Sequence, residues 1–171
     1  MISSPSAGLK GTFRVPGDKS ISHRSIMLGS LANGITEVSG FLEADDALAT
    51  LSAFEQMGVK IERIETGKLR IHGVGLHGLK APKNTLDVGN SGTSMRLLSG
   101  ILAGQQFDSV LTGDRSLTKR PMRRVLDPLS LMGANVESTA LGTSPLKIKG
   151  KTELTGIHYE MPMGSAQVKS C

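Results

Sequence analysis

The chain has few aromatic residues and almost no cysteine. Its 171 residues include four Phe, one Tyr and no Trp, so Leu, Ile, Val, Met and Ala must fill the core. The single cysteine, Cys171, excludes an intrachain disulfide and fits a reducing compartment. No apolar run approaches the roughly 20 residues that cross a membrane, and residues 1–10 lack the features of a signal peptide. We therefore expect a cytoplasmic protein with no membrane partner.

The charge balance favours small anionic partners. The formal net charge is +5, which attracts anions. Nucleic acid is a poor candidate because the Lys and Arg residues are not interleaved with aromatic residues that stack on bases. The four histidines lack the regular spacing of metal ligands, so we expect no metal. A basic surface without any partner is the alternative on charge alone.

The chain repeats a unit of 73 residues. Residues 15–20 (VPGDKS), 88–93 (VGNSGT) and 161–166 (MPMGSA) are similar openings, and each lies 73 residues after the one before. This pattern predicts an N-terminal segment over 1–13, a first unit over 14–87, a second over 88–160, and the start of a third, truncated unit over 161–171. A unit of this length favours a closed globular arrangement over a solenoid.

Hydrophobic periodicity predicts the order βαβαββ for each unit. Two helices per unit carry apolar residues at helical spacing, and the second helix of each ends at a glycine, Gly58 or Gly133. Pro121 suits a helix start, whereas Pro128 should kink or shorten its helix. The expected strands are 11–15, 36–38, 59–64, 69–73, 85–88, 109–111, 135–138 and 146–149. The first helix of each unit is expected over about 20–32 and 92–103, and the second carries its apolar residues between 48 and 57 and between 122 and 132.

Positive side chains stand at helix starts, where the helix dipole disfavours cations. Asp45 and Asp46 obey the dipole rule at one start. The other starts carry Lys or Arg beside Gly, Ser, Thr or Asn, a combination typical of phosphate and carboxylate sites. The cations are Lys19, Arg24, Arg96, Lys119, Arg120 and Lys169. The alternative is a set of solvated surface cations.

The start of the first predicted helix shows this combination most clearly. Ser20 and Arg24 are four residues apart and so share a helix face, with Lys19 just before them. They offer a hydroxyl, a forked guanidinium that suits a carboxylate, and a mobile ammonium. We expect His23, which lies in the same segment, to make a local hydrogen bond rather than to act as a base.

Four motifs resemble one enzyme family. They are residues 16–24 (PGDKSISHR), 89–96 (GNSGTSMR), 113–122 (GDRSLTKRPM) and 165–170 (SAQVKS). Together they are similar to the N-terminal part of the 5-enolpyruvylshikimate-3-phosphate synthase family. The resemblance implies an inside-out α/β barrel of enolpyruvyl-transferase type, with two lobes of three βαβαββ units each and one lobe incomplete here. It also implies transfer of the carboxyvinyl group of phosphoenolpyruvate to shikimate 3-phosphate in chorismate and aromatic amino acid biosynthesis, without a cofactor.

The resemblance implies a role for individual residues. Lys19 matches a catalytic lysine that touches both substrates. Ser20, Arg24 and Ser165 match ligands of shikimate 3-phosphate, and Asn90, Gly92 and Arg120 match ligands of phosphoenolpyruvate. Gln167 matches a residue near both substrates. Residues that carry protons in the family match no position here, so we expect this chain alone to be inactive.

Other expectations concern assembly, inhibition and rival functions. The complete family member should be a monomer, whereas this shorter chain should expose apolar surface and self-associate through it. Leu97 and Ala166 depart from the pattern of many members and leave glyphosate sensitivity open, although Gly92 favours sensitivity. Two alternatives stay open: a sister transferase acting on a UDP-linked amino sugar, and an anion-binding module without chemistry.

Overall fold

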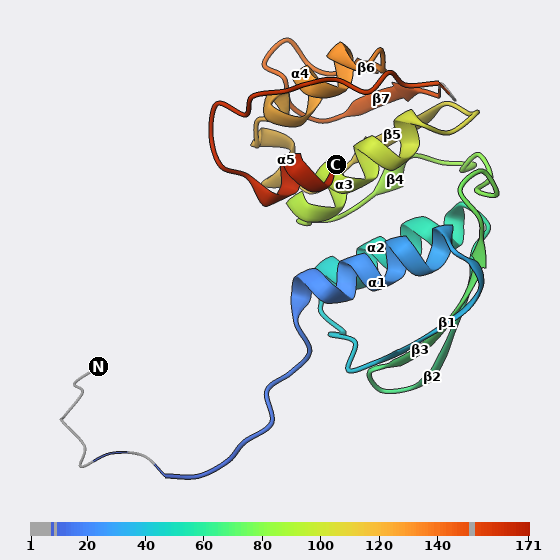
Figure 1. Cartoon of the computed structure of the whole chain (residues 1–171), viewed down its shortest axis with the longest axis vertical. Coiled ribbons are helices and arrows are strands. Elements are labelled where there is room, and N and C mark those ends of the chain that lie inside the picture. Colours follow the sequence, from blue (N-terminus) through green and yellow to red (C-terminus); the bar gives the residue numbers. More distant parts are fainter. Residues whose placement is uncertain (1–7, 9, 151–152) are drawn as a thin grey trace.

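The computed structural model describes residues 8, 10–150 and 153–171, and these form two α/β units and a terminal helix (Figure 1). In chain order the elements are α1 (Lys19–Leu31), β1 (Asn33–Ser39), α2 (Asp45–Gln56), β2 (Lys60–Glu65), β3 (Lys68–Val74), β4 (Leu86–Asp87), α3 (Gly92–Ala103), β5 (Ser109–Thr112), the 3-10 helix η1 (Leu117–Lys119), α4 (Arg123–Leu131), β6 (Asn135–Glu137), β7 (Leu146–Lys149) and α5 (Ala166–Ser170).

The first unit has three strands in the order β1-β3-β2, all antiparallel, and Thr36 of β1 lies opposite Ile71 of β3. The expected strand over 11–15 is wrong: these residues form no strand, and Phe13 and Val15 are exposed. A strand needs a neighbour for its backbone N–H and C=O groups. No strand of the described chain forms hydrogen bonds with this segment. The alternation of its side chains could not show in advance whether a partner strand exists.

The second unit has the four expected strands, in the order β4-β5-β7-β6. Strand β4 is parallel to β5, and the other two pairs are antiparallel. The predicted glycine ends are confirmed: Gly58 and Gly133 follow α2 and α4 with φ of 89° and 91°. Only glycine adopts this conformation without strain, so it stops the helix and turns the chain into the next strand.

Helix α4 contains one proline and follows another. Pro121 was expected at the first helical position, but α4 begins two residues later at Arg123, with Met122 as its N-cap residue. Pro128 lies inside α4, which has nine residues, whereas α2 has twelve. Both helices end two residues before their glycine, so the shorter length of α4 arises at its start and not after Pro128. A kink at Pro128 stays a prediction.

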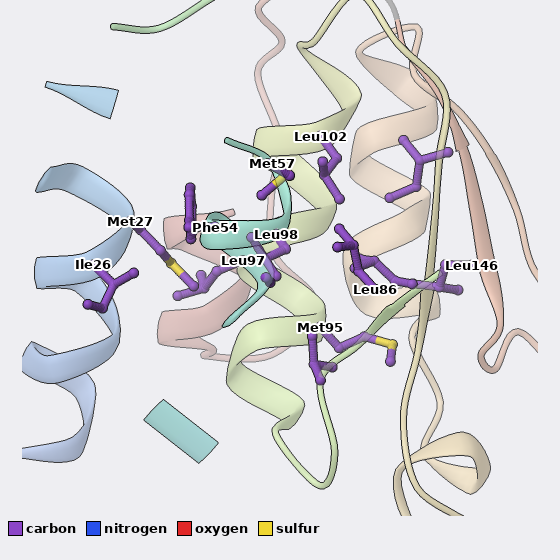
Figure 2. Close-up of a cluster of buried hydrophobic side chains, with 14 of the residues drawn as sticks. Ile26, Met27, Phe54, Met57, Leu86, Met95, Leu97, Leu98, Leu102 and Leu146 are labelled. Atoms are coloured by element: carbon purple, nitrogen blue, oxygen red, sulfur yellow. The ribbon is translucent and has the colours of Figure 1, made fainter. Parts of the chain in front are cut away.

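The core is aliphatic, as the composition predicted, and joins both units. Helices α1 and α2 lie between the β1–β3 sheet and α3, and α3 contacts both of them (Figure 1). Met27 of α1 and Phe54 of α2 approach Leu97 and Leu98 of α3 (Figure 2). Sheets therefore lie outside and helices face one another, which brings the helix ends of different units together.

Some apolar surface is exposed, as expected. Ile21 and Leu28 are seven residues apart on α1 and about two thirds of each side chain is accessible, so they share one outward face. In the part of the chain that the structure covers, no helix is both long and apolar enough to cross a membrane.

Close packing of β3 on α1 depends on glycine. A Cβ at Gly73 would lie 2.2 Å from the Ala32 carbonyl oxygen and 2.6 Å from that of Gly29. We expect Gly73→Ala to lower the free energy of unfolding by about 2–3 kcal/mol, because the backbone must move apart. Urea unfolding measures this, with Gly156→Ala as the control, since nothing lies within 4 Å of its Cβ position. Equal stability of the two variants would contradict the packing.

Candidate functional site

We call the N-terminal end of a helix its entrance. The entrance of α1 begins with Lys19, the first residue of the helix. Asp18 is the N-cap residue, and its Oδ1 accepts a hydrogen bond from the Ile21 N–H at 2.8 Å. The Lys19 Nζ lies 2.5 Å from Oδ2 of Asp46, which stands in the first turn of α2. Half of the Lys19 side chain remains exposed. The ammonium is therefore tethered at the helix entrance but still accessible to a ligand.

Arg24 links α1 to α5, which starts the predicted third unit. Its Nη1 donates to the Ser20 carbonyl oxygen at 3.3 Å, and its Nη2 donates to the Ser170 Oγ at 3.0 Å. Ser165 is the N-cap residue of α5, where its Oγ accepts from the Val168 N–H at 3.4 Å. Residues at opposite ends of the chain therefore meet beside one guanidinium.

The entrance of α3 gathers two arginines and a glutamine. Arg96 Nη1 donates to the Gln167 Oε1 at 3.0 Å, and Gln167 Nε2 donates to the Thr93 Oγ1 at 3.1 Å. A Cβ at Gly92 would lie 2.8 Å from Arg96 Nη1 and 3.2 Å from Arg120 Nη1. The missing side chain of Gly92 thus leaves room for two guanidinium groups at one helix start.

Arg120 is held by Asn90, and Asn90 by Asp114. Arg120 Nη2 donates to the Asn90 Oδ1, and Asn90 Nδ2 donates to the Asp114 Oδ2 at 2.7 Å. Asp114 also accepts from the backbone N–H groups of Ser116 and Leu117. The Asn90 hydrogen bond, followed by the Leu117 N–H, lowers the pKa of Asp114. Asp114 is therefore a fixed carboxylate that orients Asn90, and it lines an open hollow beside Arg120.

Arg96 is a buried cation that the motif analysis left out of the site. Only 7% of it is exposed, and its Nε has no hydrogen-bond partner in the described chain. Burial, then the charges of Arg124 and Arg120, lowers its pKa. A desolvated guanidinium beside two other cations favours an anion. The signal in the sequence was its place four residues after Gly92, which puts it over the helix entrance.

The structure brings most of the predicted site residues to one end of the molecule. Helices α1 and α3 both begin on the left of Figure 1, where α5 also lies. Contacts join Asn90, Gly92, Arg120 and Gln167 around the α3 entrance, while Arg24 reaches α5 from α1. Lys19 and Ser20 lie at the α1 entrance, where Lys19 pairs with α2. Which substrate each residue contacts stays a prediction.

His23 makes the local hydrogen bond that the sequence predicted. Its ring is fully buried, and Nδ1 lies 2.7 Å from the Thr50 Oγ1. Burial is the main cause that lowers its pKa; Lys19 and Arg24 lower it further, and Asp46 opposes them. A neutral ring hidden from solvent cannot reach a substrate as a base in this arrangement.

The neutral His23 predicts a loss of stability in acid. The unfolded chain takes up a proton on this histidine near pH 6.5, whereas the folded chain resists it. The unfolded state then binds more protons, so stability is full above about pH 6.5 and declines as the pH falls below that value. Urea unfolding at several pH values should show a shallower decline for His23→Gln. An identical decline in both proteins would contradict this.

Metal ligands do not cluster at these entrances. Across residues 8, 10–150 and 153–171 no group of three or more His, Cys, Asp or Glu side chains is placed to share a metal ion. The groups that converge are donors of hydrogen bonds and positive charge: guanidinium, ammonium, amide and hydroxyl. The fold and these helix starts define an α/β protein that gathers cations and hydrogen-bond donors at the N-terminal ends of its helices.

Comparison with known proteins gives the family. A family model described as EPSP synthase (3-phosphoshikimate 1-carboxyvinyltransferase) matches residues 4–171. The 3-phosphoshikimate 1-carboxyvinyltransferases of Methylococcus capsulatus and Nitrosococcus oceani are 66% and 61% identical over 98% and 99% of this chain. The solved EPSP synthase from Acinetobacter baumannii is 63% identical over 94% of this chain, with a TM-score of 0.90.

The chain belongs to the EPSP synthase (3-phosphoshikimate 1-carboxyvinyltransferase) family. Its fold is accordingly the inside-out α/β type of the enolpyruvyl transferases, without a closed barrel in the described residues. It spans 38% of the length of the first two relatives. The family assignment leaves the sister transferase for UDP-linked amino sugars without support.

Proposed function

We propose that this chain forms part of a 3-phosphoshikimate 1-carboxyvinyltransferase and holds its two substrates. In that reaction the 5-hydroxyl of shikimate 3-phosphate adds to C2 of phosphoenolpyruvate while C3 takes up a proton. The tetrahedral intermediate then loses a proton from C3 and expels inorganic phosphate, which leaves the carboxyvinyl ether. The relatives that carry this name support the proposal.

The observation that carries the proposal is the contact of α1 and α3 side chains with one short helix, α5. Arg24 of α1 contacts Ser170 of α5, while Gln167 of the same short helix contacts Arg96 of α3. One ligand lying against α5 can therefore reach cations from both units. Shikimate 3-phosphate suits this geometry because its carboxylate and phosphate are separated by a ring.

Each predicted residue then has a chemical task. Arg24 would bind the shikimate carboxylate through its forked guanidinium, Ser20 would bind a ring hydroxyl, and Ser165 would donate to the phosphate. Asn90, Gly92 and Arg120 would hold phosphoenolpyruvate at the α3 entrance. Lys19 and Gln167 would lie between the substrates, where the Lys19 ammonium offsets charge that develops in both steps.

The wider organisation is part of the proposal. We take residues 14–87 and 88–160 as complete units and 161–171 as the opening of another, with 1–13 belonging elsewhere in the complete protein. The observed element order supports the first two units, and most of 1–13 lies outside the described residues. The complete enzyme would act as a cytoplasmic monomer, with the two small molecules as its partners.

Calorimetry separates this function from general anion binding. The purified chain should bind shikimate 3-phosphate more tightly than either inorganic phosphate or shikimate, because the proposed site holds both ends of the substrate. An anion-binding module without chemistry would bind phosphate and shikimate 3-phosphate alike. Equal affinities for phosphate and shikimate 3-phosphate would therefore favour the anion-binding module and contradict the transferase function.

Substitution of Gly92 tests the phosphoenolpyruvate part of the site. We expect Gly92→Ala to weaken phosphoenolpyruvate about tenfold in the complete enzyme, because the new methyl group displaces the Arg96 and Arg120 guanidinium groups. Steady-state kinetics should show a raised KM for phosphoenolpyruvate and little change for shikimate 3-phosphate. Gly104→Ala is the control, since it lies at the other end of α3 and its nearest atom is 3.8 Å away.

A further inference from the structure

A buried chain of hydrogen bonds connects the two helix entrances across the unit boundary. His23 Nδ1 lies 2.7 Å from the Thr50 Oγ1, and Thr50 Oγ1 lies 2.6 Å from the Ser94 Oγ. Ser94 Oγ in turn lies 2.6 Å from the Ser91 Oγ. The four side chains come from α1, α2, α3 and the N-cap of α3, so the chain passes through three helices.

The four side chains of this hydrogen-bond network are shielded from solvent. His23, Thr50 and Ser94 are each completely buried, and so is Ser91. A buried hydroxyl that loses its partner is costly, and the hydrogen bonds of a buried network fix the groups that make them. The network ends at the His23 ring, because His23 Nε2 has no partner in the described residues. Each hydroxyl has one hydrogen to donate and can accept others, and Thr50 Oγ1 also lies 3.4 Å from the Asp46 carbonyl oxygen, to which it can donate. The four groups therefore hold their positions together.

Both ends of the chain stand next to predicted ligand residues. His23 directly precedes Arg24 and lies one helical turn after Lys19. Ser91 lies between Asn90 and Gly92, and its Oγ also caps α3 by accepting from the Ser94 N–H at 3.2 Å. Thr50 is at the centre of this series of hydrogen bonds. Its hydroxyl joins His23 of α1 to Ser94 of α3.

We propose that Thr50, through its hydrogen bonds to His23 and Ser94, is a positioning residue that sets the α1 entrance relative to the α3 entrance. This inference rests on the proposed function, because it assigns one substrate to each entrance. None of the network's four residues is among the predicted ligand residues. Its effect is on the spacing between two binding surfaces, which a reaction between two bound molecules requires.

A double-mutant cycle tests the network without any ligand. His23→Gln and Ser94→Ala are made in the 171-residue chain, singly and together, with Thr50 intact and with Thr50→Val. We expect the two changes to be non-additive by about threefold to tenfold in the unfolding equilibrium constant, and additive once Thr50 is Val. Additive effects with Thr50 intact would overturn the inference, because His23 and Ser94 would then not be coupled through the Thr50 hydroxyl.

A second measurement asks whether the network responds to ligand. With shikimate 3-phosphate bound, the amide resonances of the buried Ser91 and Ser94 should shift in the unaltered chain. The shifts should fall to about half or less in Thr50→Val and return in Thr50→Ser, which keeps the hydroxyl. Unchanged shifts in Thr50→Val would contradict the positioning role. A chain that binds no shikimate 3-phosphate at all would instead refute the proposed function, and the positioning role with it.

Discussion

The purified 171-residue chain, given both substrates, is expected to bind shikimate 3-phosphate and to release no phosphate from phosphoenolpyruvate. The reaction needs a group that delivers a proton to C3 and later removes one. Among the described residues near the entrances, Asp46 is paired with Lys19, and Asp114 is engaged by Asn90 and two backbone N–H groups. His23 is buried and held by Thr50. These groups are occupied in fixing other residues.

A phosphate-release assay at high protein concentration measures this outcome. Calorimetry on the same sample must first show that shikimate 3-phosphate binds, so that inactivity does not reflect an unfolded chain. Turnover at a rate comparable to a complete synthase would contradict the account. It would mean that a group within this chain carries the protons of the reaction.

Replacement of Arg24 should have the largest effect on binding. Its guanidinium lies between α1 and α5, where the carboxylate of shikimate 3-phosphate is proposed to bind. A charge-assisted hydrogen bond contributes about 2–3 kcal/mol, so Arg24→Ala should weaken shikimate 3-phosphate roughly 30- to 100-fold. Arg24→Lys should recover little of this, because an ammonium cannot reproduce the two parallel hydrogen bonds.

Arg63→Ala is the matched control for Arg24. It removes the same charge from an exposed position on β2, in the sheet that covers the outside of the first unit. Long-range attraction alone would weaken binding similarly in both variants, and the effect would vanish at high salt. A loss confined to Arg24 and retained in salt would identify a direct contact.

The helices could be predicted because their signals are local. The range 92–103 was predicted as a helix and is α3 in the structure. The ends of α2 and α4 could be predicted because glycine readily adopts the positive φ that ends a helix. The strand expected over 11–15 failed because pairing is a long-range property. Phe13 and Val15 alternate as in a strand, yet no described neighbour covers them.

The site was only partly accessible from sequence. Motif spacing pointed to Arg24, Gly92, Arg120 and Gln167, but not to the groups that hold them. The Asp114–Asn90 and Thr50–Ser94 contacts join residues 24 and 44 positions apart, which no local pattern reveals. Arg96 was visible as a cation at a helix start, whereas its burial became clear only with α5 packed against α3.

A crystal structure of this chain with shikimate 3-phosphate tests the central claim most directly. The ligand should lie against α5, with its carboxylate on Arg24 and its phosphate beside Ser165 and Gln167. Density for the ligand on the outer sheet, for instance in the hollow beside Lys83, Lys147 and Lys149, would show that the helix entrances do not form the binding site.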